Sequence, residues 1–103
     1  MNMTAIKIDW ENAANLSAEF DCAEIDHEDH PETMCPWIEQ LRNCPDGRWI
    51  YSVDVPDMSV LDKNGYPVRP RSIAFGITYS RAEAVSAVEE AIRRLVGGVV
   101  IVS

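Results

Sequence analysis

The stretch SRAEAVSAVEEAIRRLVGG, residues 80–98, decides the fold. Ser80 and Glu83 form a capping box, in which the serine hydroxyl accepts a hydrogen bond from the amide of Glu83 and the glutamate carboxylate reaches back to the cap. Six apolar residues then recur at helical spacing and form one stripe: Ala84, Val85, Val88, Ala91, Ile92 and Leu95. Two arginines suit the negative end of the helix dipole, and two glycines follow. The pattern predicts a helix over residues 81–96.

Two strands precede this helix. Residues 48–55 and 72–79 alternate in period two and are rich in aromatic and β-branched side chains, which is typical of strands. We expect one face of each strand to cover the helix; these faces carry Trp49, Tyr51 and Val53, and Ile73, Phe75 and Ile77. Residues 99–102 are all apolar and indicate a further short strand.

The N-terminal half carries weaker signals. Residues 4–10 alternate like a strand, and residues 11–25 fit either a strand or a helix. Between residues 31 and 43, one helical face carries Met34, Trp37, Ile38 and Leu41. Pro36 is acceptable only in the first turn of such a helix. The sequence therefore predicts one α+β domain over residues 1–103. A small, mostly antiparallel sheet packs against helix 81–96, and a second helix near residues 35–43 closes the other side or one end.

Composition favours an ordinary cytoplasmic globule. The 103 residues are 47% hydrophobic and 25% charged, and no apolar run approaches the roughly 20 residues that span a bilayer. The N-terminus shows no secretory signal, and the three cysteines are an odd number. We therefore expect reduced thiols in a cytoplasm and no contact with a membrane.

The negative charge is concentrated at the N-terminus. Residues 1–40 hold ten acids and one base, a net charge of −9, whereas residues 41–103 hold seven acids and eight bases. Seven acids without any Lys or Arg form what we call the acidic segment, residues 19–32: Glu19, Asp21, Glu24, Asp26, Glu28, Asp29 and Glu32. Such like charges repel one another and cost stability. The acidic segment is therefore the strongest functional indication in the chain.

Two interpretations of the acidic segment remain open. It can be a solvated face that keeps the protein soluble, or a carboxylate array that replaces phosphates in a basic groove. The second interpretation predicts a basic nucleic-acid-binding protein or ribonucleoprotein as partner, without direct binding to nucleic acid. A rival interface is the connection over residues 56–71, an arm made mildly basic by Lys63, Arg69 and Arg71. A homo-oligomer is compatible with either.

A zinc site is the third possibility, because Cys22, His27, His30 and Cys35 could supply two thiolates and two imidazoles. Their spacing is not that of common zinc fingers, and neighbouring carboxylates raise the proton affinity of the histidines. We therefore expect no metal and no other cofactor. No nucleophile-elbow serine or glycine-rich phosphate loop is present, so we expect a protein without enzymatic activity.

Part of the C-terminal half resembles HicB-type antitoxins. The similar residues are Tyr51 to Asp57, Gly76-Ile77-Thr78, Glu83-Ala84 and Glu90-Ala91-Ile92. The resemblance implies a partial RNase-H-like β-β-β-α-β unit without nuclease activity, in an acidic protein that shields a small basic RNA-cleaving toxin. The Pro-Gly-Cys sequence usual in that family after its Pro-Asp-Leu is absent here, and Gly-Ile-Thr replaces Gly-Asp-Thr.

In size, charge and lack of catalytic residues, the chain also resembles phage-encoded anti-CRISPR proteins. That resemblance implies an inhibitor that binds stoichiometrically and blocks a nucleic-acid site through carboxylates. The sequence thus predicts a non-enzymatic acidic inhibitor of this type. The alternatives are a HicB-like antitoxin that neutralises a small RNase toxin and a small zinc-stabilised interaction module.

Overall fold

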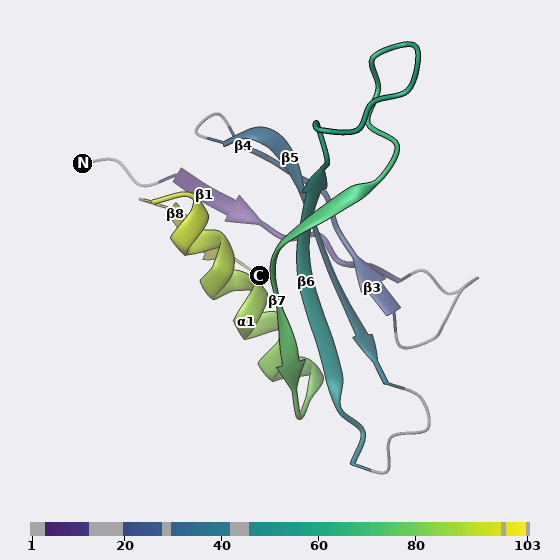
Figure 1. The fold of residues 1–103 in the computed structure, drawn as a ribbon. Coiled ribbons are helices and arrows are strands. Elements are labelled where there is room, and N and C mark those ends of the chain that lie inside the picture. The colour runs from purple at the N-terminus through teal and green to yellow at the C-terminus, as the bar shows by residue number, and fades with distance from the viewer. Residues whose placement is uncertain (1–3, 13–19, 28–29, 42–45, 98, 103) are drawn as a thin grey trace.

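The computed structural model describes residues 4–12, 20–27, 30–41, 46–97 and 99–102 (Figure 1). The elements are, in chain order, β1 (Thr4–Lys7), β2 (Glu11–Asn12), β3 (Phe20–Cys22), β4 (Ile25–His27), β5 (His30–Gln40), β6 (Trp49–Pro56), β7 (Pro70–Thr78), α1 (Arg81–Leu95) and β8 (Val99–Val102). The larger sheet is antiparallel, with strand order β2-β3-β5-β6-β7 and with β4 also paired to β5. Strands β1 and β8 form a separate parallel pair.

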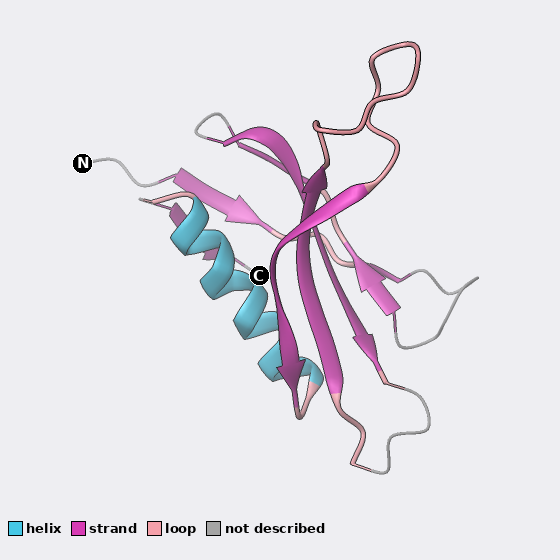
Figure 2. Cartoon of the chain, viewed as in Figure 1, coloured by secondary structure: helices cyan, strands magenta, loops and turns pink. Residues whose placement is uncertain are grey.

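Helix α1 confirms the predicted C-terminal helix and packs against one face of the sheet (Figure 2). The Ser80 hydroxyl accepts from the amide of Glu83 at 3.1 Å, as the capping box requires. The Glu83 carboxylate accepts from the amide of Tyr79 at 2.9 Å, one residue before the cap. The buried face of α1 carries Ala84, Val88 and Ile92. No helix in the described ranges is long and apolar enough to cross a membrane.

The prediction of a second helix near residues 35–43 is wrong for residues 35–40, which belong to the long strand β5. Residues 42 and 43 lie outside the described residues. Met34, Pro36 and Ile38 are all buried, which is the period-two pattern of a strand. The sequence also fitted a helical face because both periods place Met34 and Ile38 inside. Within the described part of the chain, α1 is the only helix.

Pro36 is tolerated inside β5 because of where its missing N–H falls. In a strand, the N–H and C=O groups of one residue point toward the same neighbour. The carbonyl of Pro36 accepts from the amide of Ala23 at 3.0 Å, so the pyrrolidine nitrogen faces the link between β3 and β4. Strand β3 ends at Cys22, so the N–H that Pro36 lacks falls just past the end of the β3–β5 pairing.

The prediction that Ile73, Phe75 and Ile77 face the helix is wrong for the last two. Gly76 lies opposite Tyr51 on β6, and residues opposite each other share one face of a sheet. Tyr51 packs against the core, so Gly76 also faces α1 and its neighbours point the other way. Phe75 and Ile77 are accordingly 73% and 59% exposed. Ile73 still packs against the core, because the register of the two strands shifts beside it.

The core lies between the sheet and α1 and includes residues from both halves of the chain. Its buried members are Ile6, Ile8, Ala23, Ile25, Met34, Ile38, Val53, Val55, Ala84, Val88, Ile92 and Val96. Residues 57–69 join β6 to β7 as a protruding arm, as the sequence predicted (Figure 1).

Candidate functional site

Three carboxylates from separate segments line one hollow at the edge of the sheet that carries β2 and β3. We call it the carboxylate hollow; it has a volume of about 470 Å³ and is lined by Asp9, Glu11, Cys22, Ala23, Glu24 and Cys35. Strand β2 brings Glu11 directly opposite Cys22, and the link after β3 supplies Glu24. All three carboxylates are exposed to solvent. Pairing of the strands thus gathers acids that are up to 15 positions apart in the sequence.

The hollow is electrostatically negative, because three carboxylates and no Lys or Arg line it. Burial, followed by the nearby carboxylates of Glu24, Asp54 and Asp26 and by Cys22, raises the pKa of Cys35. Such a thiol stays protonated at neutral pH, and so it is a weak nucleophile and a weak metal ligand. The one base in residues 1–40, Lys7, lies 3.4 Å from Asp9 in an exposed ion pair. The surroundings therefore favour a cationic partner.

The structure separates the predicted acidic segment into different environments. Glu24 and Asp26 are exposed, and Asp26 accepts a hydrogen bond from the Thr33 hydroxyl at 2.5 Å. Asp21 is only 8% exposed and takes two hydrogen bonds from Arg81, at 3.0 Å from Nε and 2.8 Å from Nη2. Asp21 therefore joins β3 to the start of α1 rather than facing solvent. Glu19, Glu28 and Asp29 lie outside the described residues, as does the side chain of Glu32.

Two members of the hollow, Asp9 and Glu11, were missed by sequence reasoning. They precede the acidic segment, and only the pairing of β2 with β3 places them beside Glu24. The available signal was the short run of alternating residues before position 12, but nothing in that run indicated its partner strand.

The zinc hypothesis is met in part by the described residues. Cys22 and Cys35 lie in the same hollow, both as free thiols. His27 and His30 lie opposite each other in the β4–β5 pair, but their side chains are outside the described set. Among the described side chains, no group of three His, Cys, Asp or Glu residues could hold a metal ion.

Asp54 connects three strands through a partly buried polar cluster. Its carboxylate accepts from the indole nitrogen of Trp37 on β5 at 2.8 Å. It also accepts from the hydroxyls of Ser52 on β6 and Ser72 on β7, at 2.5 Å and 2.7 Å. Each oxygen therefore already has a donor, and Asp54 serves to hold the sheet together.

The arm is an ordered structure with its own hydrogen bonds. At its base, the carboxylate of Asp57 accepts from the hydroxyl and the amide of Ser59, at 2.5 Å and 3.0 Å, and from Arg69 at 2.9 Å. The Ser59 hydroxyl, then its amide, then Arg69 lower the pKa of Asp57 to about 2. Four apolar side chains of the arm are exposed: Met58, Leu61, Tyr66 and Val68. The arm thus also has the features of an interaction surface.

Comparison of the chain with known protein families, with curated proteins and with solved structures finds no match. Its function is therefore inferred from the described residues and their geometry. They place a carboxylate hollow at one edge of the sheet and an ordered arm between β6 and β7.

Proposed function

We propose that this protein is a non-enzymatic acidic inhibitor that binds stoichiometrically to a basic nucleic-acid-binding protein or ribonucleoprotein. It would block the nucleic-acid site of that partner in the manner of anti-CRISPR proteins. The observation that carries this proposal is the carboxylate hollow, where Asp9, Glu11 and Glu24 converge with exposed Asp26 on the adjacent strand β4.

The physical basis of the proposal is electrostatic attraction between carboxylates and a groove that normally binds phosphates. Duplex DNA carries one negative charge per roughly 1.7 Å of axis, and the groove that binds it presents Lys and Arg at matching density. A surface of closely spaced carboxylates attracts those cations and competes with the phosphates. Residues 1–40 contain only one base, Lys7, beside ten acids. Nearby positive charges therefore do not neutralise the attraction of these acids for a basic groove.

The contact residues that we propose differ from the acidic segment at three positions. Asp21 is left out, because its carboxylate already binds Arg81. Asp9 and Glu11 are added, because they line the hollow beside Glu24. Glu19, Glu28, Asp29 and Glu32 remain part of the proposed surface on the basis of their position in the sequence alone.

The test uses two charge-matched double variants. Glu11→Lys with Glu24→Lys alters the hollow, whereas Asp46→Lys with Glu90→Lys alters exposed acids of the C-terminal half; each pair changes the net charge by the same amount. Partners are captured from a bacterial lysate on the unmodified protein, identified by mass spectrometry and purified. We expect a nucleic-acid-binding partner that saturates at a fixed molar ratio and binds more weakly as salt is raised.

The hollow variant should lose this partner, and the control variant should retain it. Equal loss in both variants would mean that only net charge matters. Full binding by the hollow variant, or inactivation of the partner far below one equivalent, would contradict the proposal.

One observation favours a second candidate, a HicB-like antitoxin. From β5 onward the chain follows the order β-β-β-α-β that the resemblance implies, although β8 pairs with β1 rather than with the larger sheet. The partner would then be a small RNA-cleaving toxin, which the same capture distinguishes. For the zinc-stabilised module, elemental analysis of the purified protein is the direct measurement.

A further inference from the structure

Strand β7 ends the sheet with an open edge. It pairs with β6 on one side, and no described residue pairs with its other side. Its backbone therefore offers unpaired N–H and C=O groups at alternate positions. Proteins commonly protect such an edge with charges or proline. In β7 these occur only at its start, as Pro70 and Arg71, and residues 72–78 carry no charge. The open edge is thus a template for another strand.

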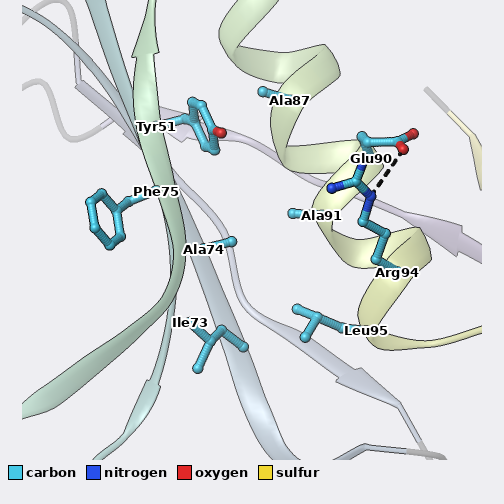
Figure 3. Close-up of a pocket in the computed structure, with 9 residues that line it drawn as sticks. All are labelled: Tyr51, Ile73, Ala74, Phe75, Ala87, Glu90, Ala91, Arg94 and Leu95. Carbon is cyan, nitrogen blue, oxygen red and sulfur yellow. Dashed lines mark hydrogen bonds and ion pairs between the residues drawn. The ribbon is translucent and has the colours of Figure 1, made fainter.

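A groove runs beside this edge, between β7 and α1 (Figure 3). Its volume is about 410 Å³, and its lining is largely apolar: Tyr51, Ile73, Ala74, Phe75, Ala87, Glu90, Ala91, Arg94 and Leu95. On the helix, Ala87, Ala91 and Leu95 are only half-buried and follow the fully buried stripe of Ala84, Val88 and Ile92. The charged rim is a pair of residues, Glu90 and Arg94, that bind each other at 3.2 Å.

Small residues on β7 keep the groove open. Ala74 and Gly76, in the middle of β7, lie opposite Val53 and Tyr51 and face α1, beside the larger Ile73. A Cβ atom on Gly76 would lie 2.7 Å from the Tyr51 ring, so glycine is what lets this ring lie against the strand. In Figure 3 the ring of Tyr51 points toward the helix, and Phe75 points away from it.

We propose that this groove binds an extended segment of a partner protein, which adds to the sheet as a strand along β7. The open backbone edge requires an extended occupant, since only a strand can pair with it. The apolar groove requires large apolar side chains at every second position of that segment. The intervening side chains would lie beside exposed Phe75 and Ile77 on the other face, so the segment is uncharged on both faces.

A second copy of this chain fits the groove less well. Strand β7 of another copy would present Ala74 and Gly76 in the middle of the groove, with Ile73 as its one large apolar side chain on that face, and so would fill the groove less than a segment with large side chains at every second position. The groove also lies at the opposite edge of the sheet from the carboxylate hollow, so it is independent of the proposed function.

The experiment selects binders from a phage-displayed library of random twelve-residue peptides on the full chain. Two variants of one helix provide the comparison: Ala91→Trp fills the groove, and Ala82→Trp places the same side chain on an exposed position. We expect enriched peptides with apolar residues at alternate positions. Their affinity should fall at least about tenfold for Ala91→Trp and stay within about twofold for Ala82→Trp.

Amide hydrogen exchange on the unmodified protein gives a readout that needs no variant. Binding of an enriched peptide should slow exchange at alternate residues of β7 at least about tenfold and leave β3 unchanged. Sedimentation of the free protein tests the rival occupant. Failure to enrich peptides, equal binding to both variants, protection elsewhere than β7, or a dimer that protects β7 without peptide would each overturn the proposal.

Discussion

Residues 49–95 and residues 4–40 reach their structures by different routes. In the C-terminal half, β6, β7 and α1 follow one another in the chain, and each carries its own local signal. In the N-terminal half, β2, β3 and β4 are only two or three residues long, and such short segments carry no clear local signal of their own. The charge differs as well, since residues 1–40 carry a net charge of −9 and residues 41–103 a net charge of +1.

This difference indicates that the N-terminal half depends on the C-terminal half. Strand β5 is held between β3 and β4 on one side and β6 on the other. The ion pair from Asp21 to Arg81 bridges 60 positions of sequence and attaches β3 to the helix start. An acidic segment whose charges repel one another gains order from these contacts rather than from its own propensity.

The largest expected effect comes from Ile92→Asp in the shared core. Ile92 is fully buried between α1 and the sheet, and an unpaired carboxylate there should cost on the order of 4–5 kcal/mol. That is comparable with the entire stability of a small domain, so both halves should unfold together. Far-UV circular dichroism and urea titration measure the loss.

The matched control for this variant is Ser86→Asp, which places the same charge on an exposed position of α1. It should leave stability within about 0.5 kcal/mol. A cooperative melt of Ile92→Asp at an unchanged temperature would contradict the assignment of the core. Selective loss of the N-terminal strands alone would contradict the shared core.

The sequence predicted secondary structure correctly where the spacing of apolar residues fits either a helix or a strand but not both. The α1 pattern is long, capped and helical, and the β6 and β7 alternations are long enough to define strands. Residues 34–38 fit both the helical and the strand period. Pro36 did not decide between them, because proline is acceptable in a first helical turn and also at this position of β5, opposite the link between β3 and β4. Which face of β7 meets the helix also depended on a register shift that no local pattern encodes.

The sequence predicted the chemical character of the candidate site, a cluster of carboxylates, but not which residues form it. Composition located the negative charge, and the exposed carboxylates of Glu24 and Asp26 agree with it. Composition could not show that Asp21 turns inward to Arg81, or that Asp9 and Glu11 join the hollow. These placements follow from pairing between β2 and β3, whose register is a tertiary property.

The connection between the halves is tested by Asp21→Asn, a nearly isosteric change that removes the charge facing Arg81. The carboxylate is nearly buried but the arginine is half-exposed, so solvent screens the pair and we expect a loss of about 1–2 kcal/mol. Hydrogen exchange should become faster in β3 than in β6 or β7.

The control, Asp9→Asn, removes an exposed partner of Lys7 and should have an effect below about 0.5 kcal/mol. An equal effect of both variants would mean that this ion pair does not join the halves.

The smallest expected effect is a local pH dependence of the arm, which belongs to the C-terminal half. The pKa of Asp57 lies at about 2, below its ordinary value of 3.8, because Ser59 and Arg69 donate to its carboxylate. A lowered pKa means that this stabilisation is present above about pH 3.8 and is lost as the pH falls toward about 2.

NMR titration of the Asp57 carboxyl carbon measures the pKa, and amide exchange at Ser59 reports opening of the arm base. Asp57→Asn should abolish this pH dependence while leaving exchange in β3 and β5 unchanged. Titration of Asp57 near 3.8, or the same pH response in the N-terminal strands, would show that the arm is not a locally stabilised unit.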